Sequence, residues 1–247
     1  MKVLVTGARG FIGRNLIEAL KSRKGFEIFK YDREDNPEEL EIYCRNCEYL
    51  FHFAAVHRPD NGIEFEKVNH QFFSDLLNRL RSHKNSCPVL LTSSIQAEDD
   101  TDYGRSKKAA EKALVEHSRA IDSRAIIYRL TNTFGRYARP NSHSVVATFC
   151  HHIARGLPIQ VNDPERVMQF YYIDDVIESF IAHIDDGHGP DADGFYRLPP
   201  EYKYEITLEQ LAQRLYIFKK LLGVGIQPVL TDTFTAKLFA TYQSYSK

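Results

Sequence analysis

Short apolar runs alternate with helical patterns along the first half of the chain, and this alternation restricts the possible folds more than any other feature. The runs lie at residues 2–6, 26–31, 49–55, 88–93 and 124–130, and apolar residues at helical spacing separate several of them. Strands that alternate with helices form a parallel sheet, and right-handed crossovers place helices on both of its faces. The sequence therefore predicts an α/β fold with a doubly wound parallel sheet.

The pattern changes after residue 135. Loops rich in Pro, Asn and His surround shorter elements there, with helices expected near residues 145–154, 174–184 and 207–222 and strands near 158–161 and 169–172. We therefore expect a first domain at residues 1–135 and a smaller C-terminal lobe at 136–247 that is interleaved with it.

Charge and composition exclude some classes of function. The 247 residues include 32 Lys+Arg and 33 Asp+Glu, which gives a net charge of −1 and argues against a nucleic-acid partner. No apolar run approaches the roughly 18 residues of a membrane helix, and the chain begins on a strand pattern rather than a leader, so we expect a cytoplasmic protein with no membrane partner. The four cysteines contain a single C-x-x-C pair, which predicts no metal site.

A glycine loop follows the first predicted strand and opens the first predicted helix. Gly7, Gly10 and Gly13 have the spacing G-x-x-G-x-x-G. Glycines at such a turn let a pyrophosphate approach the backbone, and the helix N-terminus supplies N–H donors. In this strand–turn–helix context the motif favours a Rossmann-like, dinucleotide-binding first domain.

Asp32 and Arg33, which follow the second predicted strand, indicate different cofactors. Asp32 is the acidic residue expected to bind the adenine ribose hydroxyls of NAD, whereas Arg33 suits the 2′-phosphate of NADP. The residues themselves leave NADP(H) and NAD(H) open.

A tyrosine and a lysine lie four residues apart in a predicted helix. Tyr103 and Lys107 share one helical face, where an ammonium lowers the pKa of a phenol that exchanges a proton with a substrate oxygen. Ser93 and Ser94 end the preceding strand, where a hydroxyl can orient the same oxygen. Helix capping is the structural alternative for these serines.

These motifs identify a family resemblance. The chain resembles extended short-chain dehydrogenases/reductases, the nucleotide-sugar epimerase/dehydratase group. Five segments carry the resemblance in order: residues 6–13, 51–55, 92–94 with Tyr103 and Lys107, 128–135 and 169–176.

A narrower resemblance is to the N-terminal reductase part of CapF/WbjC-type enzymes of capsular polysaccharide and O-antigen synthesis. It lies in residues 56–59, 93–97, 141–150, 159–163 and 240–245. The resemblance implies NADPH-dependent reduction of the C4 ketone of a UDP-2-acetamido-2,6-dideoxy-L-hexos-4-ulose, a UDP-sugar partner and a homodimer. The C-terminal cupin epimerase domain of that group is expected to be absent here, either deleted or a separate protein.

The resemblance also assigns roles to residues. Tyr103 is implied as proton donor, Lys107 as the group that holds its pKa and the nicotinamide ribose, and Ser94 as the group that binds the substrate carbonyl. The implied cofactor-binding residues are Gly7, Arg9, Gly10, Phe11, Ile12, Gly13, Asp32, Arg33, Phe53, Ala54, Ala55, Asn69, Ser93, Tyr103 and Lys107. The substrate-binding candidates are Ser94, Asn132, Arg139 and Arg166, of which the two arginines suit a diphosphate but are equally compatible with solvated surface positions.

Two other functions stay open. An NAD-dependent nucleotide-sugar 4-epimerase shares these motifs, and a non-catalytic NADP-binding regulatory protein shares the fold. Water elimination is disfavoured, because Ile95 and Gln96 stand where dehydratases carry an Asp-Glu pair, and neither exchanges a proton at neutral pH.

Overall fold

The computed structural model describes residues 1–56, 64–185 and 189–246. His57, Arg58 and Pro59, which contribute to the narrower resemblance, lie outside the described residues. The chain divides into two compact units, Met1–Leu130 with Ser179–Arg197, and Thr131–Glu178 with Leu198–Lys247.

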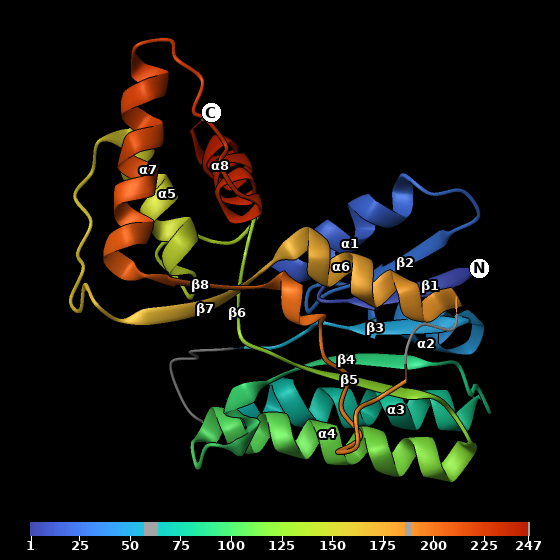
Figure 1. The fold of residues 1–247 in the computed structure, drawn as a ribbon. Helices are drawn as coiled ribbons and strands as arrows, with labels where there is room; N and C mark the ends of the chain where they lie inside the picture. Colours follow the sequence, from blue (N-terminus) through green and yellow to red (C-terminus); the bar gives the residue numbers. More distant parts are fainter. Residues whose placement is uncertain (57–63, 186–188, 247) are drawn as a thin grey trace. The chain divides into compact units, whose positions relative to one another are not determined.

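The first unit is built on a five-stranded parallel sheet with the order β2-β1-β3-β4-β5 (Figure 1). Its strands are β1 (Lys2–Thr6), β2 (Glu27–Tyr31), β3 (Tyr49–His52), β4 (Val89–Ser94) and β5 (Ala125–Leu130). The chain passes from β1 to one side and then returns to β3 on the other, so the carboxyl ends of β1 and β3 flank the topological switch point, where doubly wound folds bind ligands. The predicted fold class is confirmed.

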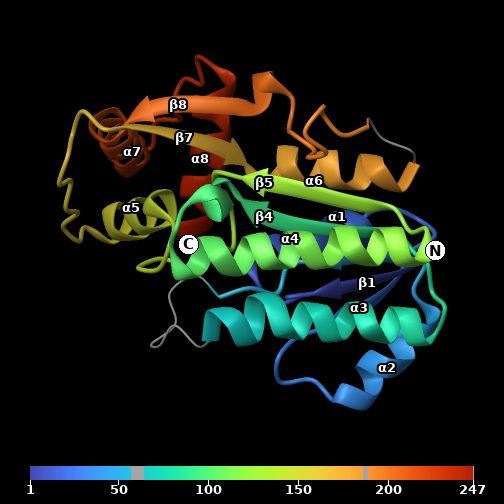
Figure 2. The ribbon, with the colours of Figure 1, turned by 90° about the horizontal axis from the view of Figure 1, so that it is seen from below.

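Helices cover both faces of this sheet, as Figure 2 shows. One face carries α1 (Phe11–Lys21), and the other carries α2 (Pro37–Asn46), α3 (Phe72–Ser82) and α4 (Asp102–Ile121). A π-helical turn at Phe65–Gln71 precedes α3, and a 3₁₀ turn at Ile95–Glu98 joins β4 to α4. The core beneath α3 consists of fully buried apolar side chains from both layers, among them Leu4, Leu50, Phe73, Leu76 and Val89.

The second unit contains a three-stranded sheet with the order β6-β7-β8. β6 (Asn132–Phe134) is parallel to β7 (Val167–Tyr172), and β8 (Lys203–Thr207) is antiparallel to β7. Three helices pack on one another, α5 (Val145–Arg155), α7 (Leu208–Gly223) and α8 (Thr233–Tyr245). α6 (Ile173–Ala182) begins in this unit, continues into a 3₁₀ turn at His183–Asp185, and ends in the first unit. A further 3₁₀ turn at Pro200–Tyr202 precedes β8.

The strand expected at residues 158–161 is wrong, because this segment is a loop. Its apolar residues alternate as in a strand, but Pro158 supplies no N–H, and its carbonyl oxygen pairs with the ring Nδ1 of His152 at 2.8 Å instead of a sheet partner. Among the described residues, no helix is both long enough and apolar enough to span a bilayer.

Two buried histidines of the first unit have lowered pKa values. Burial lowers the pKa of His52 to about 3 and that of His117 to about 4. The Nδ1 of His52 shares a hydrogen bond of 2.8 Å with the Thr6 hydroxyl, whereas neither ring nitrogen of His117 meets a partner among the described residues. In the folded protein both imidazole rings are therefore neutral.

We predict that stability falls as the pH drops below about 6.5, the pKa of histidine in an unfolded chain. From there towards pH 4 the unfolded chain binds protons that the folded chain excludes, which costs up to about 1.4 kcal/mol per pH unit for each histidine. Urea unfolding at pH 7, 6 and 5 measures this dependence, and His117→Leu makes it shallower. An unchanged pH dependence in His117→Leu contradicts the assignment.

Candidate active site

The glycine loop packs directly against the segment that follows β3. Gly7 has a φ of +68°, and a Cβ at this position would lie 2.7 Å from both the Ala54 nitrogen and the Phe53 carbonyl carbon. Only glycine combines this backbone conformation with so close an approach. The loop after β1 and residues 53–54 therefore form one edge of the sheet at the switch point.

The next two glycines differ in what surrounds them. A Cβ at Gly13 would lie 2.2 Å from the Gly7 oxygen, so Gly13 packs α1 onto the loop. At Gly10 a Cβ would lie 3.1 Å from the Gly7 backbone oxygen, which is also a tight contact. Gly10 caps α1 without a side-chain hydrogen bond, and the first turn, with Phe11 and Ile12, holds no acidic residue. This uncapped helix end is an arrangement that suits a pyrophosphate.

Asp32 faces this loop. Its Oδ2 accepts the Arg9 backbone N–H at 2.7 Å, and the Arg9 guanidinium binds Asp35 at 2.5 Å. Burial raises the pKa of Asp32, which the Arg9 contacts partly oppose. Arg33 is exposed beside this cluster. The structure thus brings both candidate selectors of the adenine ribose to the same turn.

Ser94 and Tyr103 are brought together by the 3₁₀ turn between β4 and α4. The two side chains share a hydrogen bond, and Ser94 Oγ also accepts the Gln96 N–H at 3.2 Å. Burial raises the pKa of Tyr103 to about 12, although the Ser94 hydrogen bond lowers it. Gly104 makes this approach possible, because a Cβ there would lie 2.3 Å from the Gln96 oxygen.

Lys107 lies one turn further along α4 and is 4% exposed. Its ammonium donates to the Thr92 carbonyl oxygen at 2.7 Å. Burial lowers the pKa of Lys107 to about 8, and the charge of Glu111 opposes this shift. The acidifying effect of Lys107 on Tyr103 that the resemblance implies stays a prediction.

Asn69 is buried, and its side chain links the segment after β3 to α4 instead of lining an open groove. Its side-chain oxygen accepts the Val56 N–H at 2.8 Å, and its amide donates to the Val56 oxygen at 3.0 Å and to Ser106 Oγ at 3.1 Å. It therefore fixes the segment after β3 to α4. Ala55, predicted for the cofactor groove, lies in that segment and is half-buried.

The remaining substrate candidates lie in the second unit. Asn132 lines a cavity of about 100 Å³, together with Thr133, His143, Ser144, Val145, Met168 and Phe170. Its amide donates to the Gln169 oxygen at 3.1 Å. Arg139 and Arg166 are exposed and do not line this cavity, so the structure does not gather these three side chains at one cavity.

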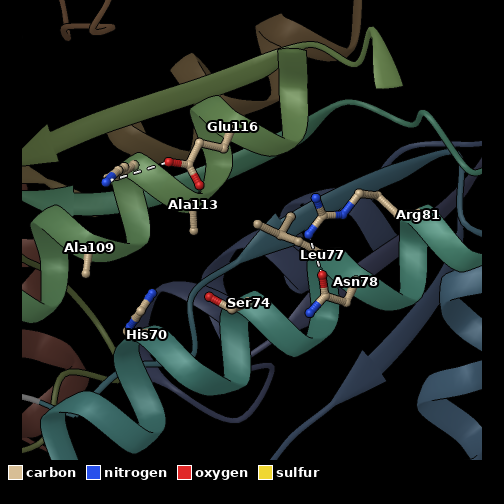
Figure 3. Close-up of a pocket in the computed structure, with 9 residues that line it drawn as sticks. His70, Ser74, Leu77, Asn78, Arg81, Ala109, Ala113 and Glu116 are labelled. Carbon is tan, nitrogen blue, oxygen red and sulfur yellow. Dashed lines mark hydrogen bonds and ion pairs between the residues drawn. The ribbon is translucent and has the colours of Figure 1, made fainter. Parts of the chain in front are cut away.

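A larger hollow of about 350 Å³ lies between α3 and α4 (Figure 3). Its lining consists of His70, Ser74, Leu77, Asn78, Arg81, Ala109, Lys112, Ala113 and Glu116. None of the predicted cofactor-binding or catalytic residues belongs to it. The candidate site is therefore the sheet edge with the glycine loop, Ser94, Tyr103 and Lys107, and not this hollow.

Comparison with known proteins decides the family. The model of the NAD dependent epimerase/dehydratase family matches residues 3–194. The chain belongs to this family. This confirms the predicted family.

Individual relatives show which members of the family the chain is similar to. The chain is 40% identical over 245 residues to UDP-2-acetamido-2,6-beta-L-arabino-hexul-4-ose reductase of Pseudomonas aeruginosa, covering 99% of this chain and 65% of that protein. The solved CapF structure from Staphylococcus aureus matches with a TM-score of 0.89 and 35% identity over 99% of this chain and 66% of that one. The chain thus spans about two thirds of the length of these relatives. Thermus thermophilus UDP-glucose 4-epimerase with NAD shares the fold, with a TM-score of 0.76 and 19% identity over 99% of both chains.

Sequence reasoning missed two groups that support the site. Glu111 and Arg129 form an ion pair with Arg129 Nη2 2.8 Å from Glu111 Oε2, and Ser93 Oγ donates to the same carboxylate. The available signal was the spacing of Tyr103, Lys107 and Glu111, which repeat every four residues and so share one face of α4. Ser93, predicted to bind the cofactor, is 5% exposed.

Proposed function

We propose that this chain is an NADPH-dependent reductase of the C4 ketone of a UDP-2-acetamido-2,6-dideoxy-L-hexos-4-ulose, in the synthesis of capsular or O-antigen sugars. The observation that carries the proposal is the hydrogen-bonded pair of Ser94 and Tyr103 next to buried Lys107, on the same sheet as the glycine loop. The similarity to the Pseudomonas reductase supports the choice of substrate.

The residues at the sheet edge fit a dinucleotide. The uncapped first turn of α1 would receive the pyrophosphate, and Asp32 with Arg33 would meet the adenine ribose. When bound, the nicotinamide ring supplies the hydride. Ser94 would orient the ketone oxygen, and Tyr103 would donate the proton to it from its hydroxyl.

The protonation state of Tyr103 is compatible with a role as proton donor. With a pKa raised to about 12, the phenol is protonated at neutral pH and can donate its proton to a ketone oxygen. Lys107 contributes a positive charge near the site below its pKa of about 8.

A reductase and a 4-epimerase differ in their cofactor balance. The reductase consumes one NADPH for each sugar nucleotide, whereas an epimerase returns its cofactor to the starting state. We expect loss of the NADPH absorbance at 340 nm in equal amount to the keto sugar added. Conversion of the sugar nucleotide without net NADPH consumption favours the epimerase, and cofactor binding without conversion of any sugar nucleotide favours the regulatory protein.

Arg33 is proposed to select NADPH, and Arg33→Ala tests this. An exposed arginine beside the ribose site pairs with a 2′-phosphate, and a charge-assisted hydrogen bond of this kind contributes about 1.5–3 kcal/mol. The variant is expected to weaken NADPH binding by about tenfold with NADH binding unchanged, as measured by cofactor fluorescence. Equal losses for both cofactors would remove Arg33 from this role.

The proposed partners follow from the same resemblance. We propose a UDP-sugar substrate, a homodimer formed across the hollow between α3 and α4, and a cytoplasmic location. Asn132, Arg139 and Arg166 are proposed to contact the substrate from the second unit.

A further inference from the structure

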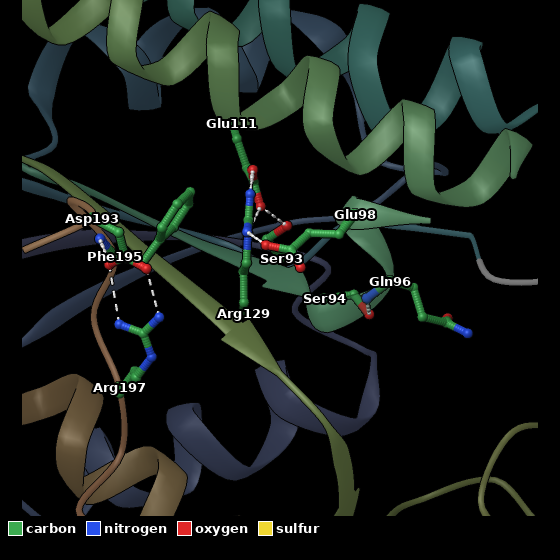
Figure 4. A network of polar contacts seen from close by, with 9 residues as sticks. All are labelled: Ser93, Ser94, Gln96, Glu98, Glu111, Arg129, Asp193, Phe195 and Arg197. Atoms are coloured by element: carbon green, nitrogen blue, oxygen red, sulfur yellow. Dashed lines mark hydrogen bonds and ion pairs between the residues drawn. The ribbon is translucent and has the colours of Figure 1, made fainter. Parts of the chain in front are cut away.

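A buried ion pair lies behind the candidate active site (Figure 4). The carboxylate of Glu111 accepts hydrogen bonds from Nε and Nη2 of Arg129, at 2.9 and 2.8 Å. The Glu111 side chain is 6% exposed and that of Arg129 is 19% exposed. Removing two charges from water costs free energy that a pair does not always recover, so burial of this kind is weak evidence for a role in stability. What the pair contacts indicates another role.

The pair contacts the end of β4 just before Ser94 and the 3₁₀ turn just after it. Before it, Ser93 Oγ donates to Glu111 Oε1. After it, Arg129 Nη1 donates at 2.7 Å to Glu98, which ends the 3₁₀ turn that places Tyr103 beside Ser94. The backbone at Ser94 is thus fixed by contacts at the residue that precedes it and at the turn that follows it.

The same carboxylate also acts on the lysine of the site. Glu111 lies one helical turn after Lys107 on α4, and its charge supports the buried ammonium, which reaches the Thr92 oxygen at 2.7 Å. The Lys107 charge reaches His52 of β3, whose pKa it helps to lower, and Tyr103 precedes Lys107 by one turn of α4. The charge of Glu111 raises the pKa of Lys107 against the effect of burial.

An aromatic side chain shields the pair from water. The Phe195 ring stacks on the Arg129 guanidinium, whose central carbon is 3.8 Å from the ring centroid. The strand-like segment that carries Phe195 is attached to β5, since the Tyr196 N–H donates to the Ile127 oxygen at 2.9 Å. A guanidinium stacked in this way keeps its orientation, and its two hydrogen bonds to Glu111 are screened little.

Resting on the proposed function, we propose that Glu111 and Arg129 are positioning residues that fix Ser94 opposite Tyr103, and that the Glu111 carboxylate also supports the Lys107 ammonium. Neither residue needs to touch the substrate or the cofactor. Their loss should therefore lower kcat and leave cofactor affinity unchanged, and it should change the pH dependence of turnover, which a merely structural pair would not do.

The test is Glu111→Gln, which keeps the shape of the side chain and removes its charge. We expect kcat to fall by about tenfold or more, with NADPH affinity within about twofold of the wild type. The alkaline limb of kcat, set by Lys107 near pH 8 in the wild type, should move down by about one pH unit. Glu41→Gln is the matched control, because it breaks another Glu–Arg pair, with Arg79, between α2 and α3 of the same unit.

Titration of Lys107 by NMR, on protein with isotope-labelled lysine and with Lys107→Arg to assign the signal, needs no substrate. A lower Lys107 pKa in Glu111→Gln supports the inference even if the wild type proves inactive on the keto sugar, which would defeat only the proposed function. Unchanged kcat and unchanged Lys107 titration in Glu111→Gln overturn the inference. If Glu111→Gln does not fold, Ser93→Ala serves instead, because it removes only the hydrogen bond from Ser93 Oγ to Glu111. A wild-type kcat in Ser93→Ala would then overturn the inference.

Discussion

Replacing Tyr103 with phenylalanine is expected to lower kcat for reduction by about 1000-fold, the range in which a positioned proton donor acts. The variant removes one hydroxyl, which shares a hydrogen bond with Ser94, and retains the ring that meets Phe65 edge-on with centroids 5.8 Å apart. The fold and the glycine loop are untouched, so NADPH affinity should change by less than about threefold. Stopped-flow hydride transfer and cofactor fluorescence measure the two quantities separately.

Tyr216→Phe is the matched control for this experiment. Tyr216 is 46% exposed on α7 of the second unit, so the loss of its hydroxyl should leave kcat unchanged. A Tyr103→Phe variant that reduces the keto sugar nucleotide at the wild-type rate would show that another group donates the proton.

Gly13→Ala is expected to abolish dinucleotide binding, with a loss of affinity of at least about 100-fold. The added Cβ would lie 2.2 Å from the Gly7 oxygen and 2.9 Å from the Ala8 Cα, and both are backbone atoms that move only with the loop. Displacing the loop disrupts its contact with Ala54 and the first turn of α1, where the pyrophosphate is expected to bind. Isothermal titration with NADPH gives the affinity, and thermal unfolding reports how much of the change is loss of fold.

Gly223→Ala is the control, because a Cβ there meets no atom within 4 Å. It should leave both the affinity and the unfolding temperature near those of the wild type. Wild-type NADPH affinity in Gly13→Ala would mean that the cofactor does not bind at this loop.

The sheet and the glycine loop were predictable because their signals are local. Most strands of the first unit are short apolar runs, and the three glycines lie within seven consecutive residues. Geometry that depends on distant residues was not predictable in this way. The link between Glu111 and Arg129 joins α4 to β5, and the Phe195 ring that covers it comes from a segment more than sixty residues later.

The second unit shows where local patterns mislead. Residues 158–161 alternate like a strand, yet they have no strand beside them, whereas β8 is a strand because β7 offers it an antiparallel edge. Asp32 and Arg33 show that local sequence also does not reveal which contacts a side chain makes. Only the structure indicates that Asp32 accepts an N–H from the glycine loop while Arg33 is exposed.

The central claim is that the Ser94, Tyr103 and Lys107 site directs a hydride to the C4 ketone of the sugar nucleotide. The most direct measurement is turnover of a UDP-2-acetamido-2,6-dideoxy-L-hexos-4-ulose with NADPH that carries deuterium at the transferable position of the nicotinamide, followed by mass spectrometry and NMR of the product. We predict a single deuterium at C4, formed in equal amount to the NADPH oxidised and lost in Tyr103→Phe. A product without deuterium at C4, or binding of both ligands with no NADPH oxidation, would contradict the account.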